Sequence, residues 1–467
     1  MTEAGVKDGL WSPHRRATTV GLVLLVTLVA FEALAVNTAL PEAADELGSL
    51  GLYGWVFAGF LLAMVASIAI SGRAIDERGL YPVLAVGAPL FCIGLLIGAT
   101  APSMIILVGG RVVQGLGAGA ISSVANVSIG RAYPPRLRAA MLAVMSSSWV
   151  VPGLVGPGLS AFIASTLGWR WVFAGLIPIV AGAALLTLPA VHRFGPTDES
   201  RAHAATRRTG DALFVAAGFA FVVGGLSNAH DLWPLGLVVV GLFIARPALV
   251  RLSPPGTFRL APGPPAAIAL NAIINFAFFS VDAFLPLAVA DVRDRGVGFA
   301  GLALALGALS WTAGAWMTAR LQHVSVVVRV RVGFVLVATA VGLTLIGLQP
   351  DVPILIFPLA WIVAGLGMGL GYQGLVLVVM GGGDSDEDDG GPAGTLVAAR
   401  QIIDTLGTAT GTGVAGAIVA VATASNHATK DALTISFVLM IAVALFGAAV
   451  SGRVQPAAVD APPALRR

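Results

Sequence analysis

The chain has 467 residues, of which 57% are hydrophobic and only 11% are charged. Soluble domains usually carry about 25% charged residues, so this composition excludes an ordinary soluble protein and indicates an integral membrane protein. The formal net charge is only +3 and the basic residues are scattered over short loops, which argues against nucleic-acid binding. A single cysteine, Cys92, excludes an internal disulfide framework.

Apolar segments of roughly 20 residues, the length of a transmembrane helix, recur along the whole chain. The first six cover residues 17–40, 51–71, 82–100, 103–130, 138–164 and 170–191. The first of these runs also resembles an export signal. It is longer than the ~7–15-residue apolar core of such signals, so we expect the chain to retain it as a span.

The middle of the chain separates two sets of six spans. Residues 192–210 are polar and predict a connector, which precedes a tight pair of apolar segments at 211–228 and 232–250. A second connector, residues 251–265, is rich in proline and glycine and cannot form a continuous helix. Six further spans are predicted at 266–290, 298–320, 331–348, 353–380, 394–422 and 432–451.

The predicted fold is therefore an all-α membrane protein with fourteen spans. It has one six-helix bundle at residues 17–191, two extra central helices at 211–250, a second six-helix bundle at 266–451, and tails at 1–16 and 452–467. Two six-span halves are typical of transporters built from repeats, whose binding site lies between the halves near the centre of the bilayer.

The distribution of basic residues predicts the orientation, because lysine and arginine favour cytoplasmic loops. Of the 27 lysine and arginine residues, 21 lie in segments on the side of the N-terminus and four lie in loops on the other side. This places both termini in the cytoplasm. We expect the membrane to be the plasma (inner) membrane. The acidic stretch 381–392 then faces the cytoplasm, and we interpret it as a solvated linker, since a calcium loop needs its own ligand spacing.

Two acids inside predicted spans are candidates for proton coupling. Glu32 lies in the first span and Asp282 at a similar depth in the seventh, the equivalent helix of the second half. An ionised acid in hydrocarbon is costly unless it is paired, so burial favours binding of a proton and an approaching cation favours its release. The alternative for Glu32 is a structural ion pair with Arg111, a permanently charged residue inside the fourth span.

The eleventh span carries a third acid, Asp404, four residues after Arg400, and this spacing places both on one helix face as an expected ion pair. Weaker candidates for a substrate cavity are polar or aromatic residues within spans, each of which also has an ordinary helix-packing role as an alternative. They are Asn37, Asn126, Asn271, Asn275, Trp311, Tyr372, Gln373 and Asp404.

Three motifs in the first half resemble the major facilitator superfamily. SGRAIDERG is similar to the family's loop motif between spans two and three, although Glu77 stands where the family usually has a basic residue. GGRVVQGLGAGA in span four is similar to the proton-coupling motif, and VPGLVGPGLS in span five is similar to the antiporter motif, with Pro152 in place of its first glycine. The matching residues are Gly72, Asp76, Arg78 and Gly79; Arg111, Gln114, Gly115 and Gly117; and Gly156, Pro157 and Gly158.

These motifs also have physical interpretations. Asp76 is expected just past the end of span two, where it accepts hydrogen bonds from the first amides of span three or pairs with arginines. The glycines allow close approach of helices, and Pro157 removes a backbone donor so that its helix bends or packs tightly. The segment GWRWVF after span five resembles the fourteen-span drug:proton antiporter branch of the family.

The resemblance implies proton-coupled efflux of amphipathic or cationic drugs by alternating access. A dedicated exporter of one endogenous metabolite or lipid is the alternative, and a membrane receptor is disfavoured because the segments outside the spans are too short for a signalling domain. The expected partners are a small-molecule substrate, protons and the lipid bilayer, without nucleic acid, and the expected state is a monomer.

No enzyme is predicted. The six histidines fall in tails or connecting loops without metal-ligand spacing, so no metal site is expected. The chain has no GxxxxGK[ST] phosphate-binding loop, so no nucleotide cofactor is expected and an ion gradient is left as the energy source.

Overall fold

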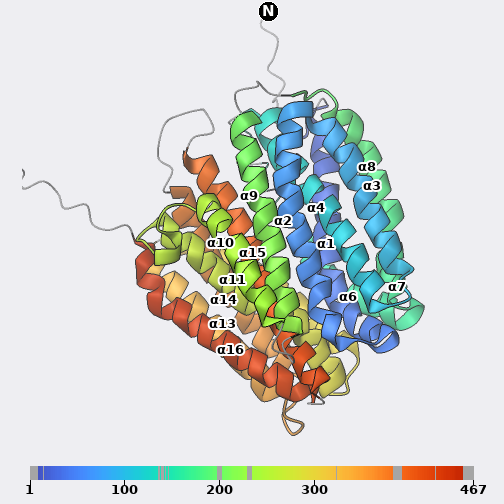
Figure 1. Ribbon diagram of the computed structural model, residues 1–467, viewed down its shortest axis with the longest axis vertical. Helices are drawn as coiled ribbons and strands as arrows, with labels where there is room; N and C mark the ends of the chain where they lie inside the picture. The colour runs from blue at the N-terminus through green and yellow to red at the C-terminus, as the bar shows by residue number, and fades with distance from the viewer. Residues whose placement is uncertain are drawn as a thin grey trace, which may run out of the picture.

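The computed structural model describes residues 9–13, 15–134, 137, 141, 144–145, 147–196, 202–228, 234–321, 323–381, 392–425 and 428–455. The tails before Gly9 and after Gln455, most of the acidic stretch 381–392 and much of the start of the fifth predicted span lie outside these residues. Every regular element in the described part of the chain is helical (Figure 1).

The N-terminal half is built from helices that follow the predicted spans. They are α1 (Arg16–Leu47), α2 (Tyr53–Arg78), α3 (Leu80–Ala99), α4 (Met104–Ala132), α6 (Val150–Leu167), α7 (Arg170–Ala174) and α8 (Leu176–Val191). A short 3-10 turn, η1 (Leu50–Leu52), joins α1 to α2.

The two extra helices and the C-terminal half follow in the same manner. The extra pair is α9 (Ala202–Ser227) and α10 (Leu235–Leu252), followed by the turn η3 (Thr257–Arg259). The C-terminal helices are α11 (Pro264–Leu287), α12 (Val297–Arg320), α13 (Val326–Gly347), α14 (Ile356–Gly381), α15 (Pro392–Ala424) and α16 (Thr429–Val450). A π-helical turn, η4 (Ala288–Val292), extends α11, and η5 (Ser451–Val454) ends the described chain.

The helices agree with the fourteen predicted spans. Thirteen segments of the described chain are long and apolar enough to cross a membrane, and α6 is a shorter apolar helix in the place of the fifth span. The sixth span differs in detail, because Gly175 separates α7 from α8 where we expected one unbroken helix.

Two helices extend further into polar sequence than predicted. The stretch SGRAIDERG is not a loop, since α2 continues through Arg78 and only Gly79 lies between α2 and α3. Likewise, α9 begins at Ala202, within the expected connector 192–210. Hydropathy misses these turns, the last of α2 and the first of α9, because they are polar. In α2 an ion pair between Arg73 and Glu77 (2.6 Å) supports the helix there.

The two halves touch toward one end of the molecule. We call the end where α1 begins the terminal end, and the opposite end, which carries the turns after α1 and α13, the far end (Figure 1). A Cβ atom added at Gly54 of α2, near the far end, would lie only 2.5 Å from the Cα of Gly416 in α15. On the other side of the molecule, one added at Gly301 of α12 would lie 3.0 Å from the carbonyl oxygen of Pro157 in α6.

The extra pair α9–α10 lies along the seam between the halves. In Figure 1, α9 stands beside α2 and α15, and side chains of all three helices form one small apolar cluster that includes Val65, Val215 and Leu406. A Cβ atom at Gly413 of α15 would lie 2.6 Å from the side chain of Val223 in α9. The extra helices therefore pack against both halves.

The glycine contact between α2 and α15 generates a stability prediction. Because a methyl group at Gly416 would collide with backbone of α2, we expect Gly416→Ala to destabilise the protein by about 1–3 kcal/mol. The matched control is Gly182→Ala in α8, where a Cβ atom would meet nothing within 4 Å. Thermal unfolding in detergent micelles measures both variants. Equal melting temperatures for the two variants would contradict the close contact.

Candidate functional site

Glu32 on α1 and Arg111 on α4 form an ion pair in the protein interior. The Arg111 Nη1 donates to Glu32 Oε1, and the two residues are only 0% and 2% exposed. Arg111 Nη1 also donates to Gln114 Oε1 (3.0 Å), and its Nε donates to the carbonyl oxygen of Val56 (3.0 Å). The guanidinium lies over the ring of Phe60, 4.2 Å from its centroid. The pair thus cancels two charges inside the membrane, where either alone would be costly.

Glycines in α4 bring its neighbours close enough to surround Arg111. A Cβ atom at Gly115 would collide with the backbone carbonyl of Phe60 in α2, and one at Gly117 would lie 2.6 Å from the Cα of Phe91 in α3. These are the expected helix-packing contacts of the GGRVVQGLGAGA motif. The same short spacing between α2 and α4 allows Val56 of α2 to accept the guanidinium's hydrogen bond.

Asp282 on α11 is held by neutral donors from both halves. Asn37 Nδ2 of α1 donates to Asp282 Oδ2 (2.9 Å), and Trp361 Nε1 of α14 donates to Oδ1 (3.0 Å). Asp282 is 5% exposed and has no ion-pair partner among the residues that the structure describes. The two buried acids therefore differ, since Glu32 faces a permanent cation and Asp282 faces only amide and indole N–H groups.

A chain of aromatic rings, which we call the aromatic wall, runs from Asp282 through the C-terminal half. Trp361, which binds Asp282, has its ring centroid 6.0 Å from that of Phe278. Phe278 is 5.6 Å from Trp311 of α12, and Trp311 is 5.7 Å from Tyr372 of α14. Trp361 and Phe278 were not predicted, because a tryptophan one turn inside a span equally fits an interfacial belt and a phenylalanine fits any apolar helix.

The aromatic wall ends at a second carboxylate. The predicted pair of Arg400 and Asp404 forms on α15, with Nη1 and Oδ2 2.5 Å apart. Arg400 Nη1 also donates to Tyr372 Oη (3.0 Å), and Tyr372 Oη donates to Asp404 Oδ2 (3.4 Å). The wall therefore links two acids, of which Asp404 already has a cation beside it.

The aromatic wall faces the interior of the protein. On α12, the outward face is marked by Leu302, Leu309 and Trp316, which are 46%, 40% and 67% exposed. At about 100° per residue, Trp311 lies roughly 140–200° around the helix from these positions. Its ring is partly buried against the wall and its remaining surface points away from the outward face.

Asn271 and Asn275 add unpartnered polar groups to the same face of α11 as Phe278 and Asp282. The four positions follow the spacing of one helix face. Both amides are buried, and Asn271 Oδ1, Asn271 Nδ2 and Asn275 Oδ1 have no hydrogen-bond partner in the described part of the chain. Such groups are able to receive a bound molecule or water.

Two further cavity candidates are less closely tied to this arrangement. Asn126 is exposed, and its Nδ2 donates to the Ser122 carbonyl of its own helix (2.9 Å). Gln373 is partly buried next to Tyr372 on α14.

At the terminal end, Asp76 ties α2 to α4. Arg131 Nη2 lies 3.2 Å from Asp76 Oδ1, and Arg131 Nη1 donates to the carbonyl oxygen of Gly195 after α8 (2.9 Å). Asp76 lies in the last turns of α2 itself and not past its end as expected.

Gly79, between α2 and α3, has φ +87°, which favours glycine, and a Cβ atom there would lie 2.8 Å from the carbonyl oxygen of Phe194. Arg78 is exposed beside it, and Gly72 has no atom within 4 Å of an added Cβ.

Gly156 and Pro157 of α6 lie against helices of the two halves. A Cβ atom at Gly156 would lie 3.5 Å from the ring of Phe31 on α1, and Pro157 packs against Gly301 of α12. Gly158, by contrast, has no atom within 4 Å of an added Cβ. The motif thus forms contacts of α6 with a helix of its own half and with one of the other half.

Residues 22–387 match the Major Facilitator Superfamily, so the chain belongs to this family. It is a multi-pass membrane protein with the family's fold of two six-helix bundles, here with two additional helices between them. A POT family transporter crystallised with 5-aminolevulinic acid has the same fold, with a TM-score of 0.64 at 13% identity over 94% of this chain and 96% of that one.

Many proteins are similar in sequence, including the following two. A Mycobacterium tuberculosis protein named as a probable multidrug-efflux transporter is 27% identical over 462 residues, which is 95% of this chain and 96% of that protein. Azole resistance protein 1 of Saccharomyces cerevisiae is 34% identical over 163 residues, covering 35% of this chain and 27% of that protein.

The hydrogen bond between Trp361 and Asp282 leads to a second prediction. Trp361→Phe keeps an aromatic ring against Phe278 but removes the N–H group that Asp282 accepts, so we expect a loss of about 1–3 kcal/mol of stability. Trp316→Phe on α12, where the side chain is 67% exposed, is the matched control and should change little. The melting temperatures of the two variants in detergent, compared with that of the wild type, measure the difference in stability. A Trp361→Phe variant as stable as the control would show that the bond contributes nothing.

Proposed function

We propose that this protein exports amphipathic, cationic, drug-like molecules in exchange for protons. Three observations support the proposal. A relative named as a multidrug-efflux transporter matches nearly the whole chain. The interior holds an acid without a counter-charge among the described residues, and an aromatic wall runs from that acid.

In this proposal Asp282 is the main proton carrier. A proton on Glu32 would leave Arg111 buried without a counter-charge, whereas a proton on Asp282 leaves a neutral side chain among neutral donors. Binding of a cationic substrate beside ionised Asp282 restores charge balance, so proton and substrate exclude each other. The difference in their partners is the observation that carries the proposal, in which Glu32 has a structural role with Arg111.

The aromatic wall is the proposed binding surface for the substrate's apolar part. Aromatic faces attract cations and stack on aromatic rings, and neither interaction demands one exact shape. Trp311 and Tyr372 are only partly buried, so each has surface left for a ligand. Asn271 and Asn275 supply nearby polar groups without partners in the described chain, and Arg400 with Asp404 closes the wall at its other end.

The exchange would proceed by alternating access in the plasma (inner) membrane, with both termini in the cytoplasm. The halves touch toward the far end, at Gly54 with Gly416 and at Asn37 with Asp282. Protonation of Asp282 would weaken its acceptance of the Asn37 amide, because a neutral carboxyl group is a poorer acceptor than a carboxylate. This couples the proton to the contact between halves. The protein would act as a monomeric carrier and not as an enzyme.

A charge-neutral double variant tests the separate roles of the two acids. Glu32→Gln alone leaves Arg111 uncompensated, so we expect pH-gradient-driven ethidium efflux to fall by about tenfold or more. Glu32→Gln with Arg111→Gln removes both charges and should retain most of the efflux, measured in proteoliposomes with an imposed pH gradient.

The control for this experiment is Glu46→Gln on the same helix. It removes an exposed ion pair with Arg170, its amide oxygen is still able to accept from Trp169 Nε1, and it should transport normally. If the double variant inserts and folds yet has no pH-driven efflux while Glu46→Gln does, Glu32 itself carries the proton and our assignment is wrong.

Trp311→Ala tests the binding surface. Loss of the indole should raise the KM for tetraphenylphosphonium by about twofold to tenfold with a smaller change in kcat. Trp316→Ala, on the outward face of the same helix, is the control and should leave both constants unchanged. Transport measured at several concentrations gives both values. An unaltered KM for Trp311→Ala would remove the aromatic wall from the binding site.

Competition assays separate a multidrug transporter from a dedicated exporter. Ethidium, tetraphenylphosphonium and benzalkonium share a positive charge and apolar surface but no common shape, so all three should inhibit one another's transport. Transport of only one among them would favour a dedicated exporter.

A further inference from the structure

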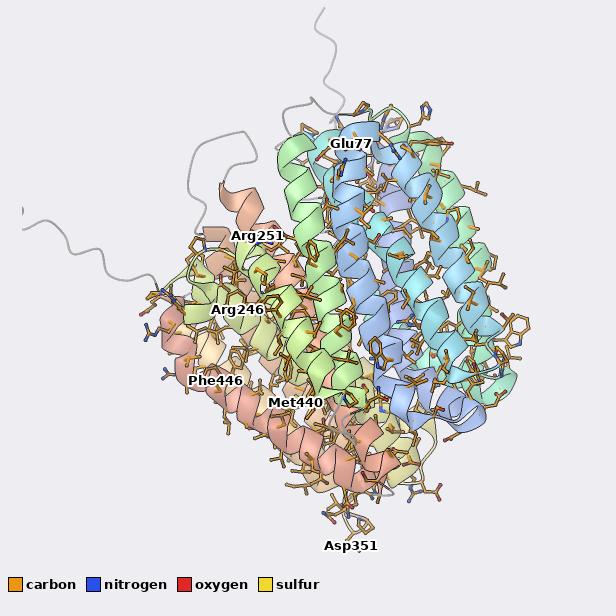
Figure 2. The ribbon with its side chains drawn as sticks, viewed as in Figure 1. Glu77, Arg246, Arg251, Asp351, Met440 and Phe446 are labelled. Carbon is orange, nitrogen blue, oxygen red and sulfur yellow. The ribbon has the colours of Figure 1, made fainter. Side chains whose placement is uncertain are left out.

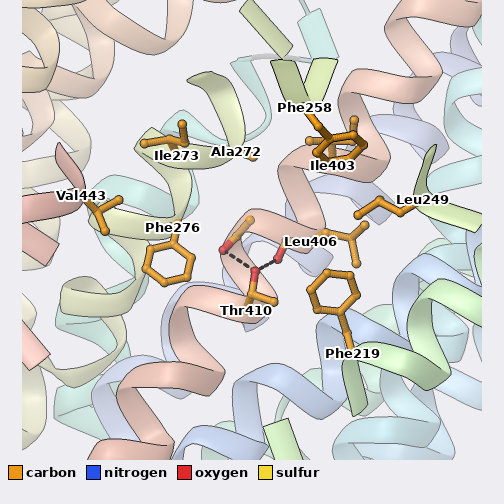
Figure 3. A pocket seen from close by; sticks show the side chains of 11 residues that line it. Phe219, Leu249, Phe258, Ala272, Ile273, Phe276, Ile403, Leu406, Thr410 and Val443 are labelled. Carbon is orange, nitrogen blue, oxygen red and sulfur yellow. Dashed lines mark hydrogen bonds between the residues drawn. The ribbon is translucent and has the colours of Figure 1, made fainter. Parts of the chain in front are cut away.

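The two extra helices leave a groove on the outer surface of the C-terminal half. It lies between the α9–α10 pair and helices α11, α15 and α16, and has a volume of about 300 Å³ (Figure 3). Phe219 and Leu249 line it on one side, Phe276 and Leu406 form its floor region, and Val443 lies on the opposite rim. Because every wall belongs to a membrane helix or to η3, the groove lies at the depth of the bilayer.

The groove has no free polar group. Its one polar lining residue is Thr410, whose hydroxyl donates to the carbonyl oxygens of Leu406 and, at 3.3 Å, Gly407 in its own helix (Figure 3). A site without polar partners does not hold ordered water. Its occupant in a membrane must therefore be apolar over this length.

The groove is open to the side. Leu249 and Val443 on opposite rims are both partly exposed. On the same helix as Leu249, Phe243 is 81% exposed, and the most apolar window of α10 is only 17% buried, less than in any other of the thirteen candidate spans of the described chain. Bilayer lipid thus has direct access to the groove from the side of α10.

Two exposed arginines without an ion pair among the described residues stand beside the groove, Arg259 at its terminal end and Arg246 at the depth of the groove itself. Phe258 lines the groove from η3, and its neighbour Arg259 is exposed. Arg246 is also exposed and lies one helical turn before Leu249 on α10 (Figure 2). Within the described residues neither arginine forms an ion pair, whereas Arg251 is paired with Asp211 (2.6 Å).

We propose that this groove binds an anionic phospholipid, with one acyl chain between α10 and α16 and the phosphate between Arg246 and Arg259. The long arginine side chains reach from the helix to the headgroup level while their stems remain on apolar surface. Positive charge at this depth favours anionic over zwitterionic headgroups. The bound chain would fill the space between the extra pair and the C-terminal bundle. This inference does not depend on which compound the protein transports.

Photo-crosslinking tests the acyl chain. Full-length protein is reconstituted in nanodiscs of phosphatidylcholine containing a trace of phosphatidylglycerol with a diazirine on one acyl chain. We expect label in peptides that contain Phe276, Leu406 and Val443. Leu249→Trp with Val443→Trp fills the groove and should reduce this labelling by about fivefold or more, whereas Ile435→Trp, at a position on α16 that is 60% exposed, should not.

The headgroup is tested with the same probe on zwitterionic phosphatidylcholine. Wild-type protein should prefer the phosphatidylglycerol probe, and Arg246→Gln and Arg259→Gln should each reduce the preference by about fivefold. Arg320→Gln, an exposed arginine near the terminal end of α12, is the control and should retain the full preference.

Three results would overturn the proposal. Labelling of the groove peptides no stronger than labelling of peptides around Ile435 would show that no chain binds there. Equal labelling by both probes in the wild type would remove the role of the arginines. Displacement of the lipid probe by tetraphenylphosphonium at concentrations that saturate transport would show that the groove belongs to the transported compound instead.

Discussion

The ion pair between Glu32 and Arg111 is the constraint around which the N-terminal half is built. An arginine inside a membrane costs ~2.5–3.5 kcal/mol or more when stranded, so helices must supply it with a counter-charge and acceptors. Here α1 supplies the carboxylate, α2 a carbonyl oxygen and an aromatic face, and α4 the amide of Gln114. The glycines of α4 allow α2 and α3 to pack close to α4 around Arg111.

The second half meets the same constraint differently. Asp282 is held by Asn37 and Trp361, neither of which has a charge to exchange, so the acid can gain or lose a proton without stranding a partner. One of its donors belongs to the opposite half. In the proposed mechanism, a change in the charge of Asp282 would act directly on the contact between halves, as a proton-driven alternating-access carrier requires.

The sequence was sufficient to predict the architecture because the membrane requires each span to be long and apolar. The connectors at 192–210 and 251–265, which lack this property, distinguished the extra pair of helices from the two bundles. It was also sufficient to predict the Arg400–Asp404 pair, which depends only on spacing within one helix. Between helices, the sequence offered the Glu32–Arg111 pair as one of two alternatives and did not predict the partners of Asp282. The partners of Asp282 come from positions far apart in the chain, and nothing in the local sequence distinguishes Trp361 from an interfacial tryptophan. The polar end of α2 was missed because hydropathy does not detect helical turns outside hydrocarbon.

Proton release from purified protein tests the central claim, that Asp282 is the exchangeable site. Tetraphenylphosphonium is added to weakly buffered protein in detergent, and a pH indicator follows the release while ligand binding is measured in parallel. We expect protons to be released from the wild type and from the charge-neutral Glu32→Gln/Arg111→Gln variant, and none from Asp282→Asn. An Asp282→Asn variant that binds the cation and releases as many protons as the wild type would contradict the account.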